Sequence, residues 1–179
     1  GTVTFETVGT GAADDTVNSF TVTGTTINVN GSIYTGEDGE ATPNPGNVDL
    51  NGAVVLGADV TIDSTDNGGG SAGSVDFSST VGSSGTPGYD LTVQAGTGGG
   101  TVSFNGIVGT DAASDLMNAL TVTGGTINLG ASVYTGEDGE ATPNPGNVDL
   151  NGTVVLGADV MIDTTDNVAA NPGLVDFSS

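Results

Sequence analysis

Basic side chains are missing from this chain altogether. It has no lysine, arginine or histidine, while 22 of its 179 residues are Asp or Glu, so the formal net charge at neutral pH is −22. No side-chain salt bridge can form without a basic partner, and carboxylates that share one surface repel each other. We therefore expect divalent cations, high salt or an acidic habitat to offset the charge.

The lack of basic residues also limits what the chain can bind. Nucleic acids are bound largely through Lys and Arg contacts to phosphates, and anionic membrane surfaces attract the same side chains. No apolar run approaches the ~20 residues that cross a bilayer as a helix. We expect no nucleic-acid partner and no membrane insertion.

Cysteine and tryptophan are absent as well. Without cysteine, neither disulfides nor thiolate metal sites can stabilise the fold. Glycine is abundant at 32 residues, but Val, Ile, Leu and Phe recur at alternating positions, which a disordered Gly-rich tract would not show. The composition predicts a folded chain with an apolar core and no covalent cross-links.

The sequence contains a tandem repeat of a unit of about 100 residues, with the second copy incomplete. Residues 34–67 return as residues 134–167 with three substitutions, and residues 1–5 return as residues 100–104 with one. Ser179 aligns with Ser79. We interpret the chain as repeat unit 1 (1–99) and an incomplete repeat unit 2 (100–179), and expect either a longer array or end-to-end stacking of copies.

Short triplets with apolar residues two apart predict β-strands, because such residues lie on one face of a strand. In the first unit they are residues 3–5, 20–22, 27–29, 48–50, 54–56, 60–62, 75–77 and 91–93. Gly, Asn, Asp and Ser clusters separate them, and we expect tight turns with positive φ at Asn30-Gly31, Asn51-Gly52 and residues 68–70. No helical period of useful length is present.

Eight short strands per unit fit two all-β architectures. A β-solenoid would wind about three strands into each coil of roughly 20 to 30 residues, with coils ~4.8 Å apart and inward apolar side chains in continuous rows. Tandem immunoglobulin-like β-sandwiches would close each unit separately, but such units usually contain a buried Trp. The missing Trp favours the solenoid.

Several strings resemble those of bacterial surface proteins built from long β-strand repeats. They are TVSFNGIVG, LTVTGGTINL and VVLGADVMIDTTDN, with VDFSS and YDLTVQAG. They are similar to filamentous-haemagglutinin-type and autotransporter passenger segments. The resemblance covers nearly the whole chain and implies a right-handed β-helix, displayed outside the cell or at its surface, that serves adhesion, matrix or filament formation. The acidic, Pro-containing segment 36–47 departs from that pattern.

Two carboxylate clusters in each unit are candidate Ca²⁺ sites, because Ca²⁺ binds six to eight oxygens at roughly 2.3–2.6 Å. The first cluster surrounds a glycine in an acidic loop, and the second follows the outward face of a strand. Neither matches an EF-hand loop or a calcium-binding nonapeptide repeat, and a solvated acidic loop is the plainer interpretation. The residues are Glu37, Asp38, Glu40, Asp59, Asp63 and Asp66, with Glu137, Asp138, Glu140, Asp159, Asp163 and Asp166.

Other functions receive less support from the residues. A chain without His, Cys, Lys or Arg lacks the usual general bases, thiolates and oxyanion stabilisers, so we expect no enzyme, with a β-helix carbohydrate-active enzyme as the alternative. The outward pairs Thr21/Thr23 and Thr121/Thr123 are compatible with an ice-binding surface, but threonine is also a common strand residue.

The sequence therefore predicts a structural repeat segment of an extracellular fibre or adhesin, stabilised by cations. Its expected partners are further copies of itself, by end-to-end or lateral assembly, together with surface glycans or other cells.

Overall fold

A computed structural model describes residues 1–10, 17–36, 45–65, 72–85, 88–110, 117–136, 146–165 and 172–179. These residues form β-strands and no helix. The strands of the first unit are β1 Thr2–Phe5, β2 Ser19–Val29, β3 Ile33–Tyr34, β4 Asn47–Leu56, β5 Val60–Asp63, β6 Val75–Phe77, β7 Val81–Ser83 and β8 Tyr89–Gln94. Those of the second are β9 Thr101–Phe104, β10 Met117–Leu129, β11 Val133–Tyr134, β12 Val148–Leu156, β13 Ile162–Asp163 and β14 Val175–Ser178.

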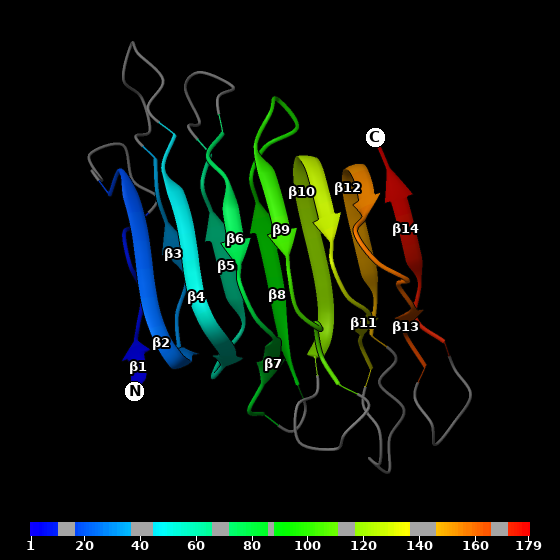
Figure 1. Cartoon of the computed structure of the whole chain (residues 1–179), viewed down its shortest axis with the longest axis horizontal. Helices are drawn as coiled ribbons and strands as arrows, with labels where there is room; N and C mark the ends of the chain where they lie inside the picture. Colours follow the sequence, from blue (N-terminus) through cyan, green and yellow to red (C-terminus); the bar gives the residue numbers. More distant parts are fainter. Residues whose placement is uncertain are drawn as a thin grey trace.

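The strands stack as the coils of a β-solenoid (Figure 1). The coils differ in length, since Thr2 pairs with Thr26 in the first coil whereas Val60 pairs with Leu91 further along. Every ladder between the named strands is parallel, whereas an immunoglobulin-like sandwich is built from antiparallel sheets. The solenoid prediction is confirmed, and the sandwich alternative is wrong.

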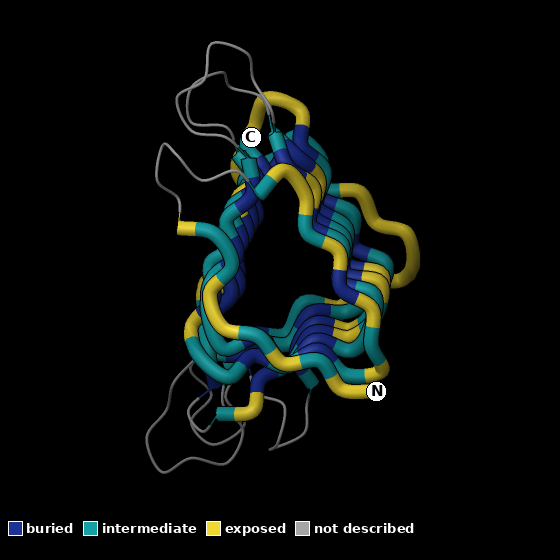
Figure 2. Tube along the Cα trace, turned by 90° about the vertical axis from the view of Figure 1, so that its left-hand side faces the viewer, coloured by how far each residue is buried: buried dark blue, intermediate teal, exposed yellow. Residues whose placement is uncertain are grey.

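Seen along the stacking direction, the coils enclose a three-sided core (Figure 2). We name the faces by their inward apolar rows. Face A contains Phe20, Val48, Val75, Val102, Ile127 and Val154. Face B contains Val3, Ile27, Val54, Val81, Val108, Val133 and Ile162. Face C contains Val8, Ile33, Ile62, Val93, Val122, Leu150 and Phe177.

The core consists of stacked aliphatic and aromatic side chains. Most row members in the interior coils are fully buried, because alternate residues of each strand point inward. Phe77 and Phe104 stack with their ring centroids 4.8 Å apart and their planes 6° from parallel. With no salt bridge possible between side chains, this packing and the backbone ladders provide the stability.

At the corner between faces A and B, the structure differs from the sequence prediction. The sequence predicts a tight turn at Asn51-Gly52, but β4 continues through it, and β2 passes the same corner with a register shift between Thr23 and Thr26. Neither Gly31 nor Gly52 has a positive φ, and residues 68–70 lie outside the described residues. Gly52 is required for a different reason: a Cβ at this position would collide with the carbonyl oxygen of Gly24 in the neighbouring coil.

The sequence repeat and the coil have different periods. Val54 lies on face B but its counterpart Val154 lies on face A, and Ile62 on face C corresponds to Ile162 on face B. One repeat unit therefore advances the solenoid by about 3⅔ turns, and identical sequence segments occupy faces one third of a turn apart.

Candidate functional site

Most of the predicted calcium ligands lie outside the described residues. They are Glu37, Asp38, Glu40 and Asp66 in the first unit, and Glu137, Asp138, Glu140 and Asp166 in the second. The acidic-loop hypothesis therefore stays a prediction. Its flanking residues are described: Tyr34 precedes the loop on face C, whereas Tyr134 precedes its counterpart on face B.

The four remaining ligand candidates are Asp59, Asp63, Asp159 and Asp163. Asp63 Oδ1 accepts hydrogen bonds from the backbone N–H of Thr65 at 2.9 Å and from its hydroxyl at 2.6 Å. Asp163 closes the same turn with Thr165, at 3.0 Å and 2.6 Å. These two carboxylates thus stabilise the local backbone at the end of a strand, in the manner of an Asx turn.

Asp59 is exposed and precedes β5, where its Oδ1 accepts the backbone N–H of Asp90 at 3.0 Å. Asp59 and Asp63 share the outward side of the strand, as the alternation predicts. However, four steps along an extended chain place their Cα atoms on the order of 13 Å apart. One Ca²⁺ ion cannot bind both carboxylates over that distance. In the described part of the chain, no three acidic side chains gather around a common point.

The structure instead brings together carboxylates that the sequence interpretation did not select. Asp49 of β4 and Asp76 of β6 are in-register partners on the outward side of face A. Their repeat counterparts, Asp149 of β12 and Asp176 of β14, are partners on face C. In-register residues of adjacent parallel strands lie about 4.8 Å apart, so each pair stacks two negative charges.

The two stacked pairs, which we call the aspartate ladders, differ in their surroundings. The hydroxyl of Thr21 donates to Asp49 Oδ2 at 3.2 Å, and the amide of Asn105 donates to Asp76 Oδ1 at 2.9 Å. In the other ladder, Asp149 Oδ1 is buried and has no hydrogen-bond partner among the described residues. The signal was present in the sequence as two Val-Asp-apolar triplets, 48–50 and 75–77, which lie one coil apart.

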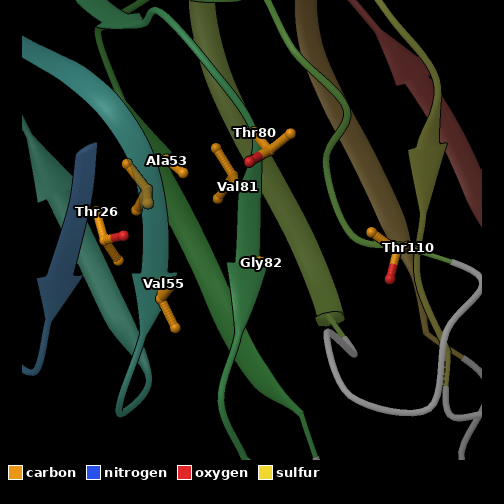
Figure 3. Close-up of a pocket in the computed structure, with 8 residues that line it drawn as sticks. Thr26, Ala53, Val55, Thr80, Val81, Gly82 and Thr110 are labelled. Atoms are coloured by element: carbon orange, nitrogen blue, oxygen red, sulfur yellow. The ribbon is translucent and has the colours of Figure 1, made fainter.

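Two surface hollows among the described residues differ in their lining from a glycosidase groove. One of about 220 Å³ is lined by Thr26, Val55, Thr80, Gly82, Thr110 and neighbouring aliphatic residues of β4 and β7 (Figure 3). Another of about 230 Å³ is lined by Thr, Asn, Val, Gly and Ser residues. Neither lining includes a carboxylate or an aromatic ring, whereas a glycosidase requires two carboxyl groups across its groove.

The threonine pairs do not form one plane. Thr21 and Thr23 lie on face A, but Thr121 and Thr123 lie on face C, because the unit rotates by a third of a turn. In the coils next to Thr121, the partners are Thr92 and Asp149, and those of Thr123 are Gln94 and Asn151. A regular double row of threonines is therefore interrupted within one coil on either side.

No protein-family model, curated protein or solved structure matches this chain. Within the described ranges, none of the secondary structure is a helix long and apolar enough to span a membrane.

Proposed function

We propose that this chain is a structural segment of an extracellular fibre or adhesin, in which repeat units stack coaxially. The observation that carries the proposal is the continuity of the ladders across the repeat boundary. Strands β6 and β8 of the first unit pair with β9 and β10 of the second, and Phe77 stacks on Phe104 across the same boundary. The two units share one core, so each added unit extends a single rod.

The charge pattern supports a role for cations in that fibre. The aspartate ladders place like charges on adjacent strands, and no basic side chain is available to neutralise them. Hard divalent cations bind such oxygens, and Ca²⁺ is the cation we propose, at the ladders or at the acidic loops. The partners proposed for the fibre are further copies of the chain, with surface glycans or other cells as adhesion targets.

An enzymatic role is not part of the proposal. The two surface hollows described above contain no paired carboxylates, and the chain has no basic residue for oxyanion stabilisation. The interrupted threonine rows likewise do not favour an ice-binding plane.

The structural role is tested by joining complete 100-residue units in tandem. Since a unit spans about 3⅔ coils, each added unit should lengthen the particle by about 18 Å at constant cross-section. Small-angle X-ray scattering on arrays of two, four and eight units measures both quantities. A length increment near twice that value, or a cross-section that varies along the array, would indicate separately folded beads and reject the proposal.

The extracellular location is tested by labelling source cells with antibodies against the folded chain. We expect equal labelling before and after permeabilisation. Labelling that appears only after permeabilisation would contradict display at the surface.

A further inference from the structure

The outward side of face B carries two rows of residues without a carboxylate. These residues alternate with the inward row along each strand, and the parallel register aligns them from coil to coil. The first row is Thr26, Ala53, Thr80, Ile107 and Ser132. The second row is Asn28, Val55, Gly82, Gly109 and Tyr134. We call these ten residues, which span five coils, the neutral strip.

The other two faces carry stacked carboxylates. Faces A and C each contain one aspartate ladder. Face C also stacks Asp59 beside Asp90, one residue before the pair of Val60 and Leu91. Because each copy of the chain has a net charge of −22, a second copy meets less repulsion over the neutral strip than over either of these faces.

The neutral strip combines a hollow with a protruding side chain. The hollow of about 220 Å³ described above lies beside Ala53, Thr80 and Gly82 (Figure 3). Ile107 follows Thr80 in the first row and is 39% exposed. Among the described residues before residue 146, no other large apolar side chain is exposed.

We propose that the occupant of the neutral strip is the same strip of a second copy, packed face to face and antiparallel about a two-fold axis at Thr80. In a two-fold interface each residue and its partner exchange places. Ile107 of one copy then lies opposite Ala53 of the other, at the hollow, and Val55 lies opposite Gly109. The inference rests on the structural role proposed above and specifies how the rods pair laterally.

A parallel arrangement fits the neutral strip less well. A two-fold axis along the first row would place Ile107 opposite Ile107 and Ala53 opposite Ala53. Two large side chains would hold the faces apart, and the gap between the two small ones would forfeit packing contacts. The antiparallel arrangement pairs a large residue with a small one at both positions.

The interface is small, so the pairing is reversible. Five coils of about 4.8 Å and a strand width of four residues give on the order of 600 Å² for the two copies together. Stable complexes bury roughly 1,200–2,000 Å², so we expect pairing only at protein concentrations of about 0.1–1 mM. Carboxylates elsewhere on the two copies repel each other, and pairing should therefore strengthen at about 0.5 M NaCl, where the Debye length is only a few Å.

Single cysteines test the pairing, because the chain contains none. Thr80→Cys places one thiol of each copy at the two-fold axis, and packed sheets lie about 10 Å apart, so a bismaleimide with a spacer of about 10 Å should join two copies. Ser74→Cys is the matched control, since Ser74 is also exposed but lies next to β6 on face A. We expect covalent dimers to form about tenfold faster with Thr80→Cys than with Ser74→Cys.

A third cysteine variant tests the orientation. Thr26 lies in the same row as Thr80, two coils away. In the antiparallel arrangement the two copies of Thr26 are four coils apart, about 19 Å along the solenoid, which the spacer cannot span. Thr26→Cys should therefore give few dimers, whereas a parallel arrangement would cross-link Thr26→Cys and Thr80→Cys alike.

An added charge tests the pairing without a cross-linker. Thr80→Asp brings two carboxylates together at the axis and should raise the dissociation constant at least about tenfold. Ser74→Asp adds the same charge on face A and should change the constant less than about twofold. Sedimentation equilibrium at about 0.5 M NaCl measures both variants. Thermal melts establish that all the variants remain folded.

Each alternative outcome overturns a stated part of the proposal. Equal cross-linking of Thr26→Cys and Thr80→Cys would overturn the antiparallel arrangement. Equal cross-linking of Thr80→Cys and Ser74→Cys, equal effects of the two Asp variants, or an unmodified chain that stays monomeric at these concentrations would overturn pairing through the neutral strip. None of these results would alter the growth of tandem arrays with each added unit, so failure here is distinguishable from failure of the structural role.

Discussion

Glycine and phenylalanine positions show how neighbouring coils constrain single residues. The parallel coils approach so closely at the corners that some positions have no room for a side chain. Gly52 faces the backbone of Gly24, and backbone atoms cannot move aside as a flexible side chain can. Phe77 and Phe177 occupy the same place in the repeat, yet one is fully buried and the other 58% exposed. Position in the stack, not local sequence, decides what each residue contributes.

We predict that Gly52→Ala, at the corner between faces A and B, destabilises the fold by about 1–3 kcal/mol. The added methyl group would force the coils that contain Gly24 and Gly52 apart. Gly157→Ala is the matched control, since the nearest atoms to its new Cβ are 3.6 Å away and a change within about 0.5 kcal/mol is expected. Urea unfolding measures both variants. Equal losses in the two would show that the close approach of the Gly24 carbonyl does not explain the effect.

We predict that replacing Phe77 and Phe177 with alanine lowers the free energy of unfolding by unequal amounts. Phe77→Ala removes a fully buried ring that stacks on Phe104 and should cost about 3–5 kcal/mol. Phe177→Ala, in an identical Val-Asp-Phe-Ser segment, should cost less than about 1 kcal/mol in the isolated chain. Denaturant titrations compare them. Similar costs would contradict the difference in burial between the two rings.

At the scale of strands, the parallel register decides which outward side chains meet. The register aligns apolar residues in the inward rows, but at two outward positions it also stacks like charges in the aspartate ladders. Amides and hydroxyls relieve part of this cost, as in the contacts of Thr21 and Asn105 with the first ladder. Asp149, with one buried oxygen that has no partner among the described residues, lies in the less relieved ladder.

We predict that Asp149→Asn stabilises the fold by up to about 1 kcal/mol at neutral pH in the absence of divalent cations, because it removes a like-charge pair. The control Glu6→Gln removes one charge beside Asn30, outside both aspartate ladders, and should leave stability nearly unchanged. Melting temperatures in chelator report the difference. If both variants gain equally, the benefit comes from net charge and not from the ladder.

At the scale of the whole molecule, repulsion between the carboxylates opposes the folding of the solenoid. A solenoid gathers carboxylates on a compact surface, and no basic side chain compensates for them. An ion that binds the folded state stabilises it by mass action, and a specific site does so at lower concentration than general screening. We therefore expect the stability of the fold to depend on cations.

We predict that chelation lowers the melting temperature at pH 7, and that Ca²⁺ restores it more effectively than Na⁺ at equal ionic strength. Variants locate the effect: Glu37→Gln with Glu40→Gln tests the acidic loop, and Asp49→Asn tests the ladder. Coincident melting curves in chelator, Ca²⁺ and matched Na⁺ would exclude specific sites and leave only screening.

Much of the architecture follows from the sequence alone. Alternation of apolar residues in triplets such as 48–50 and 75–77 encodes strands with one inward face, and the spacing between these triplets matches one coil. The complete absence of basic residues excludes side-chain salt bridges. These properties depend on local geometry and charge, which each segment carries with it.

Only the tertiary structure decided how the repeat lies on the solenoid. The segments between faces differ in length, so the coil from Thr2 to Thr26 has fewer residues than the coil from Val60 to Leu91. The face on which a residue of the second unit lies therefore depends on the lengths of all the coils before it. That dependence places Val54 and Val154 on different faces and separates the two threonine pairs. Local propensity contains no information on such long-range register, because contacts between coils and not the residues themselves determine it.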